Sequence, residues 1–120
     1  MIRGFRDLRV WQQSVEFVEE VYRLSEGFPK SELYGLTNQL RRAAVSVPSN
    51  IAEGHAKEHT KEYLNHISIA QGSLAEIETQ LEIAARLEYL SVERLAFSLE
   101  HLTSLRKQLY SLRNALSGKR

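Results

Sequence analysis

The side chains best suited to chemistry in this 120-residue sequence are four histidines and the carboxylates close to them. His59, Glu62 and His66 follow one another at spacings of three and four, which would place them on one face of a helix. Imidazole and carboxylate groups arranged in this way can bind a transition metal. Metal-binding helical bundles draw such ligands from several helices, however, and here only one helix would carry them. We therefore favour the alternative that these residues flank a break between two helices and lie in solvent, with no metal and no other cofactor.

The sequence also lacks the motifs on which most enzymatic chemistry depends. Without cysteine it has no thiol nucleophile, no thiolate zinc site and no disulfide. The phosphate-binding loops GxGxxG and GxxxxGK[ST] and the nucleophile motif GxSxG are absent. His101 is expected to face solvent, because its acidic neighbour Glu100 points elsewhere on a helix. We expect a protein that is not an enzyme.

Positive charge is concentrated at the two ends of the chain, although sixteen Lys and Arg residues nearly balance fifteen Asp and Glu residues. Residues 1–10 hold three arginines against Asp7, and residues 101–120 hold five basic side chains and no acidic one. Residues 76–93, by contrast, hold five glutamates against Arg86. If the two basic segments meet in the fold, they form a surface that can bind the phosphate backbone of a nucleic acid.

The candidate nucleic-acid-binding residues are Arg3, Arg6, Arg9, Arg106, Lys107, Arg113, Lys119 and Arg120, with Arg41 and Arg42 as further candidates. The alternative for the C-terminal group is that its charges are solvated and complement the dipole of a helix C-terminus. Arg41 and Arg42 lie within an otherwise apolar stretch, and the leading interpretation for them is an ion pair with a glutamate between residues 76 and 82. No aromatic ladder accompanies these cations, so stacking on single-stranded bases is not indicated.

The elements that must position these residues are helical. Apolar residues recur at spacings of three and four in four segments, at about residues 6–26, 31–54, 60–88 and 91–116. The breaks between them are short, so successive helices must run antiparallel. The predicted fold is all-α, with one domain over residues 1–120 that forms an up-down-up-down antiparallel four-helix bundle. This topology places the basic start of the first helix beside the basic end of the fourth.

The second segment carries Pro48 in the middle of its apolar pattern, which predicts a continuous helix with a kink at that residue. Ser49 and Asn50 follow it and could satisfy backbone carbonyls that the proline frees. A predicted helix-packing motif joins this segment to the third; it comprises Ala43, Ala44, Pro48, Asn50, Gly72 and Ser73. Gly72 belongs to it because a glycine inside a helix costs about 1 kcal/mol relative to alanine, and close packing would offset that cost.

Two helices carry more apolar surface than a single bundle needs. Besides its first stripe, each of them has a second one, formed by Val10, Phe17, Val21 and Leu24 in the first segment and by Leu64, Ile69, Ile83 and Leu87 in the third. Extra apolar faces are typical of subunit interfaces, so the pattern favours a homo-oligomer. The alternative is that a broad core absorbs both stripes.

Three segments resemble a family of bacterial four-helix bundle proteins that are often encoded in intervening sequences of large-subunit ribosomal RNA genes. The segments are FRDLRVWQQSVEFVEEVYRLSEGFP (5–29), ELYGLTNQLRRAAVSVPSNIAEG (32–54) and EYLNHISIAQGSLAEIETQLEIAARLEYL (62–90). The similarity covers about residues 5–115. This family is similar in turn to the accessory variability protein of diversity-generating retroelements.

The resemblance implies a bundle that assembles as a ring-like homopentamer with a central channel, and it implies no enzymatic activity. It also implies nucleic-acid binding through basic surface, as in the retroelement relative, which partners a reverse transcriptase. That relative is strongly basic, whereas this chain has a formal net charge of +1, so the sequence fits the ribosomal RNA intervening-sequence type better.

We therefore predict a non-enzymatic, oligomeric scaffold that binds RNA or DNA through its basic surface. The alternative is a purely structural or protein-binding module that does not bind nucleic acid. No segment is apolar enough to span a membrane and no secretory signal is recognisable, so we expect no membrane contact and a cytoplasmic location.

Overall fold

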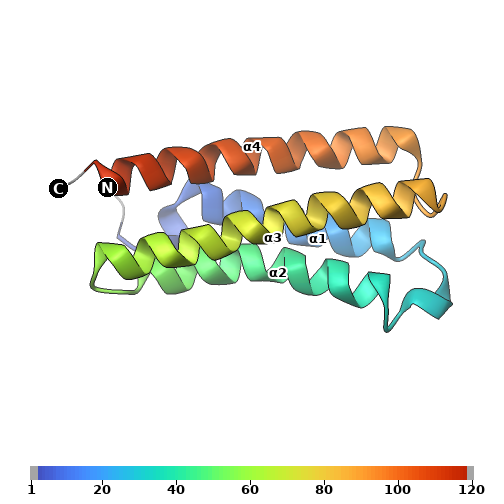
Figure 1. Ribbon diagram of the computed structural model, residues 1–120, viewed down its shortest axis with the longest axis horizontal. Helices are drawn as coiled ribbons and strands as arrows, with labels where there is room; N and C mark the ends of the chain where they lie inside the picture. The colour runs from blue at the N-terminus through green and yellow to red at the C-terminus, as the bar shows by residue number, and fades with distance from the viewer. Residues whose placement is uncertain (1–2, 119–120) are drawn as a thin grey trace.

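Four α-helices pack side by side within residues 3–118, the part of the chain that the computed structural model describes (Figure 1). They are α1 (Arg9–Ser25), α2 (Leu36–His55), α3 (Thr60–Arg86) and α4 (Val92–Ser117). Two short 3-10 turns, η1 (Phe5–Asp7) and η2 (Lys30–Glu32), precede α1 and α2. This part of the chain contains no strand, so the predicted all-α class is confirmed.

Consecutive helices run in opposite directions along a molecule of 47 × 25 × 21 Å (Figure 1). Each helix packs against its neighbours in the sequence, and α4 packs back against α1 to close the bundle. The start of α1, the connection between α2 and α3 and the end of α4 therefore lie at one end of the bundle. The other two connections lie at the opposite end.

The core runs along the bundle axis and draws apolar side chains from all four helices. Its largest fully buried members are Phe17, Val21, Leu40, Val47, Ile51, Ile67, Leu74, Ile77, Leu81, Leu102, Leu105 and Leu109. The assignment of the second stripe of the first helix to an interface is wrong, because Val10, Phe17, Val21 and Leu24 are all buried in this core. The first stripe, which includes Trp11 and Val18, packs against the core while remaining partly exposed. Periodicity identified both stripes but not which of them faces inward.

The predicted start of the second helix at residue 31 is wrong. Residues 30–32 form the η2 turn, and Gly35 interrupts the chain with φ −116° and ψ −113° before α2 begins. The new helix has a cap of its own, because the Leu36 backbone N–H donates to Oε1 of Glu32 over 3.1 Å. From there α2 runs without interruption through Pro48 to His55.

Two further helix ends differ from those that the periodicity predicts. The first helix begins at residue 9 rather than 6, because Leu8 is extended (φ −76°, ψ 124°) and separates the η1 turn from α1. The third ends at residue 86 rather than 88, because Glu88 adopts the left-handed conformation with φ 65°. The Tyr89 N–H then bonds the Ala84 carbonyl over 2.9 Å, which is the closing bond of a Schellman cap.

All residues of the predicted packing motif except Gly72 are buried. Ala43, Ala44, Pro48, Asn50 and Ser73 are buried. Gly72 is exposed, and a Cβ atom there would have no neighbour within 4 Å, so it mediates no close approach.

The glycine that does allow close packing is Gly54. A Cβ atom at this position would lie 2.8 Å from Cδ1 of Tyr63 and 2.9 Å from Cβ of His66. The last turn of α2 and the first turns of α3 can therefore approach each other only because residue 54 has no side chain.

Candidate nucleic-acid interface

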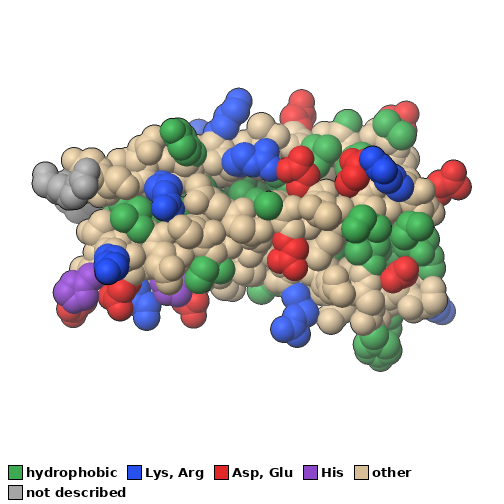
Figure 2. All heavy atoms as spheres, in the orientation of Figure 1, with side chains coloured by type: hydrophobic (Ala, Val, Ile, Leu, Met, Phe, Trp, Pro, Cys, Tyr) green, Lys and Arg blue, Asp and Glu red, His purple; other side chains and the backbone are tan. Residues whose placement is uncertain are grey.

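Charge in the folded chain is segregated along the bundle axis. One end, formed by residues 3–13, 48–73 and 105–118, holds eight Lys and Arg residues against four Asp and Glu residues; we call it the basic end. The rest of the described chain, residues 14–47 and 74–104, holds six against eleven and is the acidic end. On the face shown in Figure 2, acidic side chains gather over the middle and the right of the molecule, and a smaller group lies at the lower left. The formal net charge of +1 therefore conceals two oppositely charged ends.

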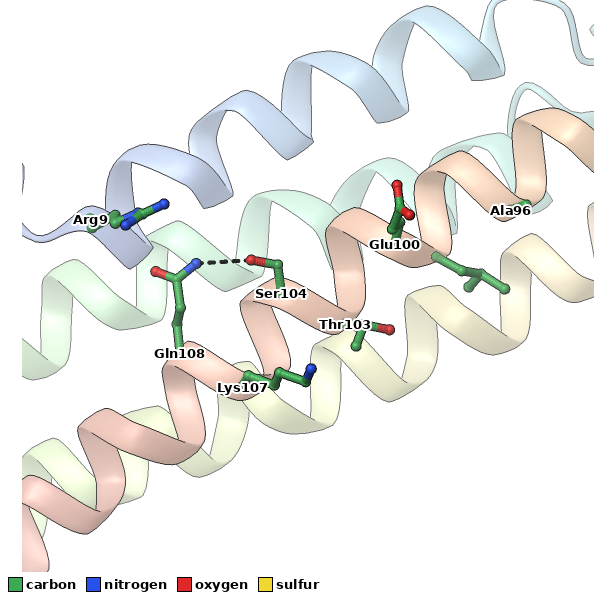
Figure 3. Close-up of a pocket in the computed structure, with 8 residues that line it drawn as sticks. Arg9, Ala96, Glu100, Thr103, Ser104, Lys107 and Gln108 are labelled. Carbon is green, nitrogen blue, oxygen red and sulfur yellow. Dashed lines mark hydrogen bonds between the residues drawn. The ribbon is translucent and has the colours of Figure 1, made fainter.

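The basic start of α1 and the basic end of α4 meet as the topology predicts. Arg9 on α1 and Lys107 on α4 line one hollow of about 630 Å³, together with Glu100, Ser104 and Gln108 (Figure 3). Gln108 spans the seam, since its Nε2 donates to Oε1 of Gln13 over 2.5 Å. Within residues 3–118, neither Arg9 nor Lys107 has a carboxylate partner within 4 Å.

A second basic groove, of about 490 Å³, lies over the first turns of α3. It is lined by Lys57, Lys61, Glu62, Leu64, Asn65, His66, Ser68 and Arg113. The Arg113 guanidinium is fixed there without a carboxylate, because its Nη1 donates to Oγ of Ser68 over 2.8 Å. It thus presents a positioned positive charge from α4 at the margin of the groove.

Lys57 and Lys61 were missed among the candidates from the sequence. The signal for them was available in the topology, because the α2–α3 connection of an up-down bundle lies at the same end as the start of α1. Charge counted along the chain does not show this, since residues 53–62 also hold Glu53, Glu58 and Glu62.

A chain of hydrogen bonds fixes His66 at the edge of this groove. The Asn50 side-chain amide donates to the backbone carbonyl of Ser46 over 2.9 Å and to Oγ of Ser46 over 3.0 Å. Oδ1 of Asn50 is then left to accept from Nδ1 of His66 over 2.9 Å. Ser73 joins the chain through a 2.9 Å bond to Oγ of Ser46. Asn50 therefore bonds the carbonyl of Ser46, and not the carbonyl of Ala44 that Pro48 leaves without its usual helical donor.

Arg3 and Arg6 lie within the basic end, each in a different setting. The Arg3 backbone N–H donates to Oδ2 of Asp7 over 3.0 Å, which caps the η1 turn. The Arg6 guanidinium stands 5.7 Å from the centre of the Trp11 ring in a cation–π contact. Lys119 and Arg120 lie outside the described residues.

The remaining candidate arginines do not join the basic end as free cations. Arg106 forms an ion pair with Glu78 across the α3–α4 seam. Arg41 lies at the acidic end, where its Nε donates to Oγ of Ser25 over 2.8 Å and its guanidinium stacks 4.6 Å from the Tyr22 ring centre. The predicted ion pair between the 41–42 arginines and a glutamate of the third helix is therefore wrong. Two of the glutamates between residues 76 and 82 are engaged elsewhere, Glu78 with Arg106 and Glu82 with Arg86.

His101 is exposed as expected, but it also contacts a buried acid. Its Nδ1 atom lies 2.6 Å from Oε1 of Glu20, a carboxylate that is only 8% exposed. The other carboxylate oxygen accepts a 2.7 Å hydrogen bond from Oγ of Ser98. The seam between α1 and α4 thus contains a buried acid that is paired with two α4 side chains.

The structure does not assemble a metal site from the histidines. His59 and Glu62 are exposed at the start of α3, while Nδ1 of His66 is turned toward α2 by Asn50. Across residues 3–118, no group of three His, Asp or Glu side chains is arranged to hold an ion. Within the same residues, no helix combines the length and apolar character needed to cross a bilayer.

Two tyrosines have altered acidity. Tyr63 packs against Gly54 and its hydroxyl lies 3.2 Å from Nδ1 of His55; burial raises the pKa of this phenol. The Tyr89 hydroxyl donates to Oε2 of Glu32 over 3.0 Å. That hydrogen bond raises the pKa of Tyr89, and burial and the negative charge of Glu32 raise it further.

The fold and these surfaces define a class: a small helical bundle whose distinguishing features are segregated surface charge and open basic grooves. Residues 6–111 match the family of 23S rRNA-intervening sequence proteins, and the chain belongs to this family. Its fold is similar to the crystal structure of a protein of unknown function from the S23 ribosomal protein family of Bacteroides thetaiotaomicron VPI-5482, with a TM-score of 0.81. That match covers 88% of this chain and 95% of the other at 24% sequence identity, and so concerns the fold alone. No curated protein matches the chain.

Proposed function

We propose that this protein is a non-enzymatic scaffold whose basic end binds the phosphate backbone of RNA or DNA. The observation that carries the proposal is the segregation of charge, which gives one end of the bundle eight basic side chains against four acidic ones. A local excess of positive charge attracts a polyanion even when the whole chain is almost neutral.

The contacts that support backbone binding are cations without carboxylate partners. Within the described residues, Arg9 and Lys107 on one side and Lys57, Lys61 and Arg113 on the other have none within 4 Å. Each can neutralise a phosphate and release a condensed counterion. The described lining of these grooves contains no Phe, Tyr or Trp side chain, so apart from the His66 ring they offer no platform for base stacking. Affinity should therefore depend strongly on salt and weakly on sequence.

Binding titrations at two salt concentrations test this proposal. A fluorescent RNA duplex and a DNA duplex of the same sequence are each titrated with the full chain at about 50 mM and about 200 mM salt. We expect saturable binding of both at the lower salt, with a large loss of affinity at the higher. Absence of binding to either duplex at the lower salt would overturn the proposal.

We also propose that the protein self-associates, as the homopentamer that the family resemblance implies. The support lies in apolar side chains that the single chain leaves exposed, among them Ile69 and Ile83 on α3, Leu87 just after it, and Val92, Phe97 and Tyr110 on α4. Several apolar side chains gather toward the right of the face in Figure 2. Light scattering should give a mass of five times the 13.8 kDa chain, and a mass equal to one chain would refute self-association.

The same exposed apolar side chains favour one alternative, a protein-binding module that does not bind nucleic acid. Affinity purification with and without nuclease distinguishes the two. Protein partners that survive nuclease treatment unchanged, together with no duplex binding, would establish the alternative.

A further inference from the structure

We propose that the groove over the first turns of α3 is a phosphate-binding site that gains a positive charge when His66 is protonated, so that nucleic-acid binding takes up a proton. The inference rests on the proposed function, because it concerns how the basic end holds a phosphate backbone. It adds a particular site and a dependence on pH.

The groove has the donors that a phosphate backbone needs. Lys61, Asn65 and Ser68 share one face of α3, since they are spaced by four and three residues. Lys57 adds a cation from the preceding connection, and Arg113 adds one from α4. Arg113 is already held in position by Ser68, so little side-chain freedom is lost when a phosphate binds it.

The hydrogen bonds behind His66 determine which of its nitrogens can titrate. The Nδ2 group of Asn50 donates to two oxygens of Ser46, which places its Oδ1 toward His66. As an amide oxygen, Oδ1 can only accept a hydrogen bond. Nδ1 of His66 must therefore carry a hydrogen whether the ring is neutral or charged. The second proton can be added only at Nε2, on the side of the ring away from Asn50.

The charged and titratable groups around His66 come from every neighbouring element. They are Glu53 and His55 from α2, Lys57 from the connection, Lys61, Glu62 and Tyr63 from α3, and Arg113 from α4. Glu53 lies 3.8 Å from Nδ1. A phosphate bound in the groove would bring negative charge close to the ring, and a nearby negative charge favours the protonated form of an imidazole.

The direction in which affinity changes with pH follows from the positive charge that a second proton adds to the ring. Histidine exchanges its second proton between about pH 5 and pH 8. As the pH falls through this range, a protonated His66 adds one cation to the groove and the affinity for a polyanion rises. One further phosphate contact makes the plot of log K against log salt steeper by about one.

The test compares the full wild-type chain with His66→Asn. The asparagine amide places a donor near the position of Nδ1 and so can keep the bond to Asn50, but it cannot take up a proton. The control is His59→Gln, which removes an exposed histidine at the same end that does not line the groove. Each protein is titrated into an RNA duplex of about 16 base pairs at about pH 5.5 and pH 8, over a range of salt.

We expect the salt slope of the wild type and of His59→Gln to steepen by about one more unit at the lower pH than that of His66→Asn. Equal pH dependence in wild type and His66→Asn would overturn this inference while leaving nucleic-acid binding intact. Absence of binding by the wild type at either pH would overturn the proposed function, and this inference with it.

A second measurement does not depend on the variant. Nuclear magnetic resonance titration of the wild type should show Nδ1 of His66 protonated throughout, with the titration midpoint of Nε2 moving to higher pH when the RNA duplex is added. A midpoint that the duplex leaves unchanged would also contradict the inference.

Discussion

Nδ1 of His101 lies 2.6 Å from Oε1 of Glu20 and joins two helices that share few other polar contacts. The ring approaches this oxygen closely but without hydrogen-bond alignment. Ser98 bonds the other oxygen of the same carboxylate. Only four residues of α4 are buried; they are Ser98, Leu102, Leu105 and Leu109. We therefore expect the contacts of Glu20 with Ser98 and His101 to contribute strongly to the packing of α4 against α1.

Glu20→Ala should lower the free energy of unfolding by about 2 kcal/mol, because it leaves the buried Ser98 hydroxyl without its acceptor and removes the close contact with His101. Half-exposed His101 can still reach water, which keeps the loss below that of a fully buried pair. Urea denaturation measures the change. The control Glu19→Ala removes an exposed carboxylate of the same helix and should change stability by less than about 0.5 kcal/mol. Equal losses in the two variants would show that the pairing does not stabilise the bundle.

Gly54→Ala and Gly72→Ala should have opposite effects on stability. At residue 54 the new methyl group would meet Tyr63 and His66 at less than 3 Å, so we expect a loss of about 1–3 kcal/mol. At residue 72 the methyl group meets nothing within 4 Å, and replacing a helical glycine should raise stability by about 0.5–1 kcal/mol. Thermal unfolding of both variants checks the pair. A stabilising substitution at residue 54 would contradict the close approach of α2 and α3.

Stability should fall in alkaline solution because of Tyr63 and Tyr89. The folded state raises both pKa values above the ordinary value of about 10, so the folded chain keeps protons that the unfolded chain releases. This contribution is complete below about pH 10 and is lost as the pH rises through the raised values. Urea denaturation at about pH 8 and pH 11 should show a smaller decrease in the double variant Tyr63→Phe/Tyr89→Phe than in the wild type. An equal decrease in both proteins would assign the alkaline loss to other groups.

The sequence was sufficient for the four helices because each carries a long apolar repeat. The leucine row of α4 is an example, since Leu102, Leu105 and Leu109 are all buried as their spacing predicts. Periodicity could not decide between two adjacent stripes on the first helix, because inward direction depends on where the neighbouring helices pack. It also could not place the start of α2, which depends on the backbone angles of Gly35 and on the Glu32 cap.

The candidate site was predicted only in part, for a different reason. Topology brought Arg9 and Lys107 together as expected, because helix direction alone determines which ends meet. The partners of individual side chains depend on contacts between residues far apart in the sequence, such as Glu20 with His101 or Arg113 with Ser68. Spacing along one helix contains no information on such pairs.

The most direct test of the proposed function compares two double variants that remove the same charge from opposite ends. Lys57→Gln/Lys61→Gln neutralises the groove, while Lys30→Gln/Arg94→Gln removes two cations from the acidic end. Both are titrated into the same RNA duplex over a range of salt. We expect the groove variant to reduce the slope of log K against log salt by about two, with the control close to the wild type. Equal losses in the two variants would contradict binding at the basic end and would show that only net charge matters.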